Sequence, residues 1–172
     1  MDNVEALDKE FGLVVDLVKL TARDLPDHTA FILDGVRQSY SETVGLMARV
    51  AAALQRDGVK QREAISVCAS TSIEYATLFL GALSIGVVTA PLAPSSTPEQ
   101  LEGMVKDSGA KLLFLDATTA DSLKNAGDAG TIRISLDGSA CGKPFAEWLA
   151  PAGASVAPAK IDPVDPFNII YS

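Results

Sequence analysis

Residues 64–92 read AISVCASTSIEYATLFLGALSIGVVTAPL, and this stretch decides the fold. A short apolar run with β-branched residues, Ala64–Ala69, is followed by a helical pattern over Ser72–Ser84. Gly86 closes the helix, and a second apolar run, Val87–Leu92, comes directly after it. Strand, helix and strand in this order predict two parallel strands joined by a right-handed crossover.

The same alternation continues toward the carboxyl end of the chain. Further strands are expected at Lys111–Leu115 and Thr131–Leu136, with short helices over Asp121–Asn125 and Phe145–Leu149. Strands that alternate with helices favour a parallel sheet with helices on both faces.

The helix expected between residues 92 and 111 has a marked start. The cluster Ser96–Gln100 offers two overlapping capping boxes, one opened by Ser96 and the other by Thr97. Pro98 suits a first helical turn, and Gly109 ends the helix.

The amino-terminal part follows a different pattern. Helical spacing of apolar residues over Phe11–Arg23 predicts an amphipathic helix. Two extended runs, Ala30–Leu33 and Val36–Tyr40, then flank Asp34-Gly35, which is a strong signal for a tight hairpin. Ser41 stands where the N-cap of the next long helix is expected. The predicted fold is therefore α/β: a doubly wound, mostly parallel sheet flanked by helices, with a short N-terminal β-hairpin.

Composition excludes several classes of protein. The chain has 172 residues, enough for one domain with a core, and 48% of them are hydrophobic. Its net charge of −8 and the lack of a basic stripe argue against a nucleic-acid partner. The longest apolar stretch, Tyr75–Ala93, is broken by polar residues, Gly and Pro, so no membrane span is expected. Without a recognisable signal peptide, a cytoplasmic location is expected.

Individual residues offer little chemistry. His28 lies between the first helix and the hairpin and is expected to be a surface histidine. Asp116 follows an apolar run where a catalytic acid can sit, but a turn-capping role is favoured. Cys68 is expected to be a buried free thiol, and Cys141, in a Gly-rich turn, a more exposed one.

The run Asp165–Ser172 predicts a buried interior strand of the parallel sheet. Ligands bind outside the carboxyl ends of such strands, so chemistry is expected directly after it. If the strand Phe167–Ser172 lacks a neighbour, its edge and apolar face would favour self-association.

Several segments in order resemble the adenylate-forming superfamily, which contains acyl- and aryl-CoA synthetases and the adenylation domains of nonribosomal peptide synthetases. The segments that carry the resemblance are Gln38–Glu42, Ser72–Leu92, Thr97–Leu101, Asp107–Phe114 and Asp165–Ser172. The resemblance extends from about Leu25 to Ser172. It implies that residues 1–150 form an N-terminal α/β subdomain, and that residues 151–172 are a Pro-rich connection and a strand leading into a phosphate-binding loop.

The resemblance also implies a reaction. Such enzymes use ATP and Mg²⁺ to convert a carboxylate into an acyl-adenylate, which coenzyme A then converts into a thioester. Within this chain only Ser172 is expected to contribute, as a hydroxyl to the ATP phosphates. No catalytic residue, metal ligand or bound cofactor is expected in residues 1–172, so this part alone is expected to be inactive.

Three readings remain open at this point. Pro91–Glu99 resembles the CoA-ligase branch, acting on a fatty or aromatic acid, because the peptide-synthetase branch tends to carry an aspartate after its Pro-Leu pair. An adenylation domain of a nonribosomal peptide synthetase is the second reading. A non-catalytic α/β scaffold or interaction module is the third.

Overall fold

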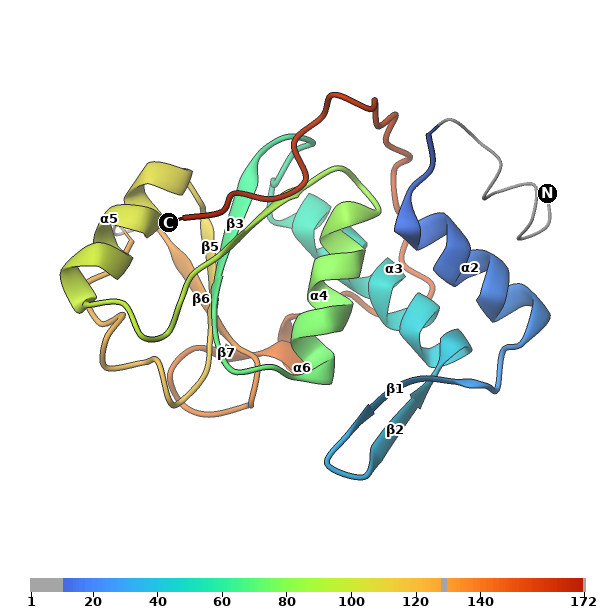
Figure 1. Cartoon of the computed structure of the whole chain (residues 1–172), viewed down its shortest axis with the longest axis horizontal. Coiled ribbons are helices and arrows are strands. Elements are labelled where there is room, and N and C mark those ends of the chain that lie inside the picture. Colours follow the sequence, from blue (N-terminus) through green and yellow to red (C-terminus); the bar gives the residue numbers. More distant parts are fainter. Residues whose placement is uncertain (1–10, 128–129, 172) are drawn as a thin grey trace.

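The structure is a computed structural model that describes residues 11–127 and 130–171. Its centre is a five-stranded parallel sheet in the order β4-β3-β5-β6-β7, with helices on both faces (Figure 1). The strands of this sheet are β3 (Ala64–Cys68), β4 (Val88–Pro91), β5 (Leu112–Leu115), β6 (Ile132–Ser135) and β7 (Lys143–Pro144). The helices are α2 (Val14–Asp24), α3 (Tyr40–Arg56), α4 (Ile73–Leu83), α5 (Pro98–Ser108) and α6 (Phe145–Trp148). The predicted fold class is confirmed.

An antiparallel hairpin of β1 (Thr29–Leu33) and β2 (Val36–Ser39) stands apart from the sheet (Figure 1). Its turn residues, Asp34 and Gly35, have φ angles of 49° and 80°. Positive φ at both central positions is what a tight hairpin turn requires, which is why the Asp-Gly pair predicted it.

The N-cap of α3 corrects the sequence prediction. The cap is Ser39, whose side chain accepts from the Glu42 amide while the Glu42 carboxylate accepts from the Ser39 amide. Ser41 already lies in the first helical turn. A capping box needs Glu or Gln three residues after the cap, and that spacing selects Ser39. In α5 the same rule selects Thr97, which forms its box with Gln100.

Two expected elements differ from the structure. Asp121–Asn125 forms hydrogen-bonded turns and not a helix, because the segment is too short to extend the single i→i+4 bond from Leu123 to Thr119. The strand β7 was not predicted, since its two residues carry no pattern. The amphipathic first helix begins at Val14, three residues later than its apolar spacing suggested.

The terminal run Asp165–Ser172 is not an interior strand, so that prediction was wrong. Its described part runs beside the outer strand β4 and makes one parallel bridge, between Thr89 and Asn168. Phe167 is 53% exposed and Ile170 is 78% exposed. An apolar run alone does not specify burial: these two side chains remain exposed, whereas Tyr171 packs partly against the core cluster that includes α5. Residues 151–171 otherwise contain turns but no helix.

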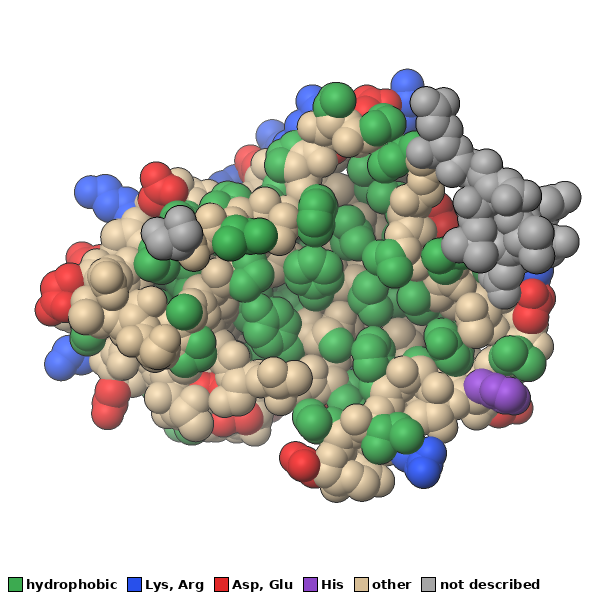
Figure 2. All heavy atoms as spheres, viewed as in Figure 1, with side chains coloured by type: hydrophobic (Ala, Val, Ile, Leu, Met, Phe, Trp, Pro, Cys, Tyr) green, Lys and Arg blue, Asp and Glu red, His purple; other side chains and the backbone are tan. Residues whose placement is uncertain are grey.

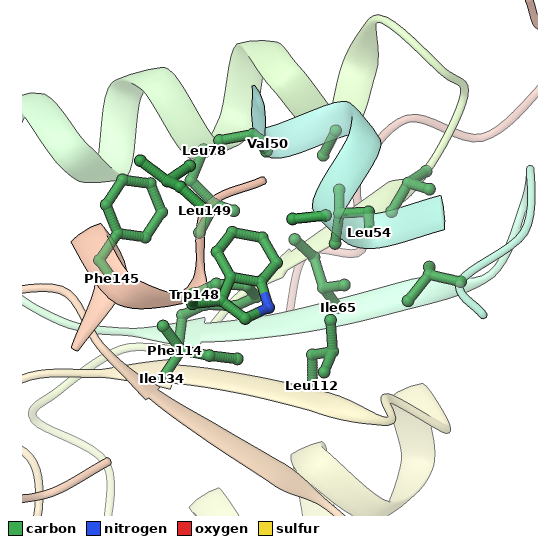
Figure 3. Close-up of a cluster of buried hydrophobic side chains, with 14 of the residues drawn as sticks. Val50, Leu54, Ile65, Leu78, Leu112, Phe114, Ile134, Phe145, Trp148 and Leu149 are labelled. Carbon is green, nitrogen blue, oxygen red and sulfur yellow. The ribbon is translucent and has the colours of Figure 1, made fainter. Parts of the chain in front are cut away.

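Side chains alternate strictly between the two faces of the sheet. Ile65 and Phe114 point to the face covered by α3, α4 and α6, where the larger core cluster lies (Figure 3). Cys68 and Leu113 point to the other face, which α5 covers. The sheet is therefore buried on both sides, as parallel sheets require.

Trp148 closes the larger cluster from the short helix α6. Its ring lies edge-on to Phe114, with centroids 5.0 Å apart and an interplanar angle of 80° (Figure 3). Its indole nitrogen donates to the Asp57 carboxylate at 2.7 Å, which satisfies the one polar group that it buries. The described part of the chain contains no helix both long and apolar enough to cross a membrane.

Helices α3 and α4 approach closely at Gly81. A Cβ added there would lie 2.6 Å from Cβ and Cγ1 of Val50, which is far inside van der Waals contact. The absence of a side chain at this position therefore sets the distance between the two helices.

We predict that Gly81→Ala destabilises the protein by about 1–3 kcal/mol, because the new methyl group overpacks a rigid interface. Urea unfolding followed by circular dichroism measures this change. The matched control is Gly45→Ala in α3, where an added Cβ meets nothing within 4 Å. That variant is expected to be more stable by roughly 0.5–1 kcal/mol, and equal effects of the two substitutions would contradict the role of Gly81.

Candidate functional site

The order of the strands marks one crevice of the sheet. From β3 the chain crosses through α4 to β4 on one side, and α5 then returns it to β5 on the other side. The direction of winding thus reverses between β3 and β5. In doubly wound sheets, ligands bind outside the carboxyl ends of the strands at this switch point. Here those ends lead into the loops 69–72 and 116–119.

Asp116 joins these two loops. One carboxylate oxygen accepts from the Ser70 amide at 2.7 Å, and the other accepts from the Thr118 hydroxyl at 2.6 Å and the Thr119 amide at 3.1 Å. Burial alone would raise the pKa of Asp116, but these hydrogen bonds outweigh it and lower the pKa. The favoured turn-capping role is confirmed, since both oxygens of this carboxylate are already engaged.

Asp137 plays the same part in the loop after β6. Its carboxylate accepts from the Ser139 amide, the Ala117 amide and the Ser135 hydroxyl, at 2.7–3.0 Å. Chiefly through the contacts with Ser139 and Ala117, its pKa lies well below the usual range. The acids at the carboxyl edge of the sheet therefore stiffen loops.

The remaining candidate residues lie where the sequence suggested. His28 is exposed in its loop. Cys68 is fully buried, and burial followed by the charge of Asp116 raises its pKa to about 11, so it remains an inert thiol. Cys141 is partly exposed and lies 3.0 Å from the Ser139 hydroxyl. Residues 11–127 and 130–171 contain no group of three or more His, Cys, Asp or Glu side chains that could hold a metal ion.

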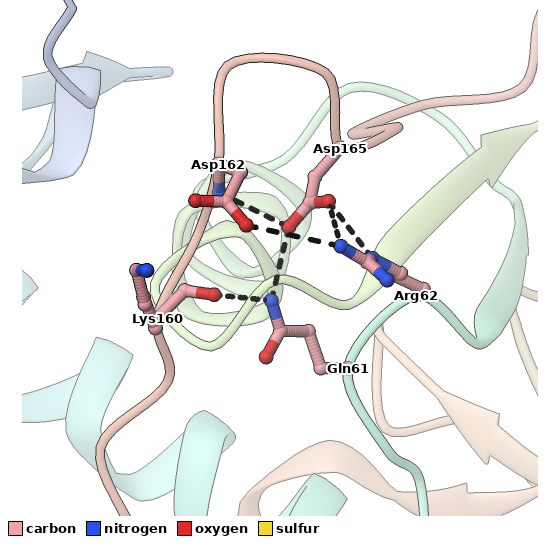
Figure 4. A network of polar contacts seen from close by, with 5 residues as sticks. All are labelled: Gln61, Arg62, Lys160, Asp162 and Asp165. Carbon is pink, nitrogen blue, oxygen red and sulfur yellow. Dashed lines mark hydrogen bonds and ion pairs between the residues drawn. The ribbon is translucent and has the colours of Figure 1, made fainter.

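A network of hydrogen bonds and ion pairs connects residues 160–165, in the segment that precedes Ser172, to Gln61 and Arg62 (Figure 4). The Asp165 carboxylate pairs with Arg62, with Oδ1 2.6 Å from Nη2 and 2.8 Å from Nε. Its other oxygen accepts from the Gln61 side chain at 3.0 Å and from the Asp162 amide at 3.1 Å. Gln61 also donates to the Lys160 carbonyl at 2.6 Å. The side chain of Asp165 is only 2% exposed, so the network pins a Pro-rich segment to the start of β3.

The segment is then fixed beyond this network by its own backbone. The Thr89 amide donates to the Phe167 carbonyl at 3.1 Å, and the Ile169 amide donates to the Thr89 carbonyl at 2.9 Å. Tyr171 ends the described part with its hydroxyl 3.0 Å from both the Met104 carbonyl and the Asp107 carboxylate.

Burial, and next the hydrogen bond to Asp107, raise the pKa of Tyr171 to about 12, so its hydroxyl remains a donor. Ser172, the predicted phosphate-binding residue, lies outside the described residues. The structure thus fixes the route of the chain up to the position before it.

Sequence reasoning missed the network around Asp165. Its two halves are about a hundred residues apart in the chain, and nothing in the local pattern of Gln61-Arg62 announces a distant partner. The signal available was an acidic residue within a Pro-rich connection, which alone indicates only a turn.

Known proteins resemble this chain in sequence. The sequence profile of the family described as "AMP-binding enzyme" matches residues 18–172. The 4-coumarate–CoA ligase 2 of Oryza sativa subsp. japonica is 30% identical over 169 residues, which cover 88% of this chain and 30% of that enzyme. Bacitracin synthase 1 of Bacillus licheniformis is 29% identical over 122 residues, which cover 71% of this chain and 2% of that synthase.

Among solved structures, VinN superposes with a TM-score of 0.80 at 28% identity, over 94% of this chain and 42% of VinN. The chain therefore spans less than a third of the curated relatives' length and under half of this structure.

We predict that Asp165→Ala loosens the terminal segment, because it removes the anchor of Arg62 and Gln61. Hydrogen exchange of the Ile169 and Thr89 amides, followed by NMR, should become roughly tenfold faster or more. Since Asp165 has a lowered pKa, chiefly through its hydrogen bond to Arg62, the anchoring is complete above the usual carboxyl range and is lost as pH falls through that lowered pKa.

Asp162→Ala is the matched control. The Asp162 carboxylate only approaches Arg62, at 4.0 Å, whereas its backbone amide keeps the bond to Asp165. Unchanged exchange is expected in this variant. Equal exchange in both variants would show that the network does not hold the segment.

Proposed function

The chain belongs to the AMP-binding enzyme family, and we propose that it acts as the N-terminal part of an ATP-dependent carboxylate–CoA ligase. In this proposal residues 1–150 are an α/β subdomain and residues 151–172 connect it to the phosphate-binding loop. The observation that carries the proposal is the similarity to the rice CoA ligase, which extends over nearly the whole chain. The cytoplasm, where ATP and coenzyme A are available, is the proposed location.

The proposed reaction has two balanced steps. A carboxylate oxygen of the acid attacks the α-phosphorus of ATP, the bond to the bridging oxygen breaks, and pyrophosphate leaves. The sulfur of coenzyme A then attacks the acyl carbon of the adenylate, its proton is released, and AMP leaves with the bonding electrons. Neither step involves oxidation or reduction.

In that reaction the role of this chain is to position the segment that leads into the phosphate-binding loop. The Asp165 network and the bonds of Tyr171 to α5 fix the route of the backbone toward Ser172. We assign the Ser172 hydroxyl to the ATP phosphates, where hydroxyl and backbone donors bind the negative charge.

The surface of the chain supports a role as part of a larger ligase. Helix α4 is apolar nearly all round, and Phe79 and Leu80 on it are only partly buried. Figure 2 shows apolar side chains gathered across this face, and Phe167 and Ile170 of the terminal segment are exposed. A helix that is apolar on every side is typical of a buried position. We propose that the rest of the ligase covers this face, and that the isolated chain self-associates through it.

A second candidate is an adenylation domain of a nonribosomal peptide synthetase. The similarity to bacitracin synthase 1 favours it, although that similarity extends over a smaller share of the chain. The two candidates share the first step and differ in the thiol that accepts the acyl group.

The complete protein encoded with this chain is predicted to exchange labelled pyrophosphate into ATP when given the right carboxylic acid. A panel of phenylpropenoic, benzoic, medium-chain and long-chain acids identifies the acid. Addition of free coenzyme A should then yield a thioester and AMP in equal amounts. Release of AMP only with a phosphopantetheine-bearing carrier protein would support the peptide synthetase instead, and no exchange with any acid would overturn both.

The isolated chain of residues 1–172 is predicted not to bind ATP, because the family resemblance assigns the phosphate-binding loop to residues that follow Ser172. Titration calorimetry with Mg-ATP should give only heats of dilution. The complete protein serves as the positive control. A micromolar dissociation constant for the isolated chain would contradict the assignment of the nucleotide site to residues beyond it.

A further inference from the structure

A cleft opens between α4 and α6 at the carboxyl edge of the sheet, with a volume of about 380 Å³, a size that suits a small ligand. Its walls are mostly apolar. Phe145 and Leu149 reach into it from the α6 side of the core cluster, toward α4 (Figure 3). Gln38, at the end of β2, lines the same cleft.

The hydrogen bonds around Gln38 fix the orientation of its amide. Its Nε2 donates to the Thr43 hydroxyl at 2.9 Å and to the Thr77 hydroxyl at 3.3 Å. Each hydroxyl uses its own hydrogen on a backbone carbonyl, Thr43 on Ser39 and Thr77 on Ile73, both at 2.8 Å. The two threonines can therefore only accept from Gln38, so the amide cannot be reversed.

As a consequence, the side-chain oxygen of Gln38 is a hydrogen-bond acceptor that has no donor in the described part of the chain. Both N–H groups of Gln38 are used, and no donor among residues 11–127 and 130–171 contacts its side-chain oxygen. The residue is only 9% exposed, so this oxygen has little access to bulk water. Because leaving a buried acceptor unpaired is energetically unfavourable, this oxygen is available to an incoming donor.

The charged side chains around the cleft indicate what kind of donor could bind to the Gln38 oxygen. Two carboxylates, Glu74 and Asp137, line it together with one guanidinium, Arg49. The Nε of Arg49 already donates to the Ala150 carbonyl at 2.7 Å, and Asp137 is held ionised by its loop contacts. Glu74, in the first turn of α4, has no ion-pair partner in the described part of the chain. The cleft thus carries excess negative charge.

We propose that this cleft binds a small primary ammonium compound with an apolar group. The ammonium would donate to the Gln38 oxygen and pair with Glu74, while the apolar group would lie against Phe145 and Leu149. This assignment goes beyond the proposed ligase reaction, whose steps require no amine.

The test is an NMR titration of the isotopically labelled chain with phenethylammonium. Phenethyl alcohol and hydrocinnamate, which share its shape but are neutral and anionic, are the comparison ligands. The expected result is about millimolar affinity for the amine, with shifts centred on the Gln38 side-chain amide and Phe145, and weaker binding of both comparison ligands. Tighter binding of hydrocinnamate, or shifts spread over the acidic surface, would overturn the proposal.

Two variants separate the acceptor from the charge. Gln38→Met removes the acceptor with little change in size and should weaken amine binding about five- to tenfold. Glu74 lies on the surface, and Glu74→Gln should weaken amine binding about two- to fivefold and reduce the dependence of that binding on salt. Glu102→Gln in α5, outside the cleft, is the matched control and should change nothing. If Glu74→Gln behaves as this control does, the site is not the one proposed, whether or not Gln38→Met folds.

Discussion

The burial of β3 and β5 on both faces is the constraint on which the rest of the structure depends. Residues that alternate along these strands belong to different cores, with Ile65 and Phe114 on one side and Cys68 and Leu113 on the other. A strand buried on both sides needs cover on both sides. Helices α3, α4 and α6 provide one cover and α5 the other, and the crossovers that place them also create the switch point between the two strands.

Sequence predicted this frame because its signals are local. Alternating strand and helix patterns, the Asp-Gly turn and the capping box of α5 each depend on residues within a few positions of one another. The predictions were wrong where a local pattern was compatible with two structures. They were also wrong where the outcome depended on whether another part of the protein covers the segment. Ser39 and Ser41 both stand near the start of α3, and only the position of Glu42 distinguishes them. The sequence pattern of the apolar run Asp165–Ser172 does not depend on whether another layer of structure covers it.

The candidate site was less predictable, for a physical reason. Asp116 was correctly expected to cap a turn, since the hydroxyls that engage it follow directly in the sequence. Asp165 and Gln38, by contrast, derive their roles from partners that the fold brings together: Arg62 lies 103 residues from Asp165, and Thr77 lies 39 residues from Gln38. No periodicity encodes such pairs, so only a three-dimensional structure shows them.

Helix α4 connects these observations. One side of it packs on the sheet, its amino-terminal half brings Glu74 and Thr77 to the cleft, and its remaining side is apolar and only partly covered in the described residues. A shift of α4 would therefore disturb its contacts with the sheet, with the cleft and with the apolar side together. At Gly81, α4 lies so near α3 that a Cβ would not fit between them. A part of a ligase that packed on the apolar side and displaced α4 would also displace Thr77, which is hydrogen-bonded to the Gln38 amide.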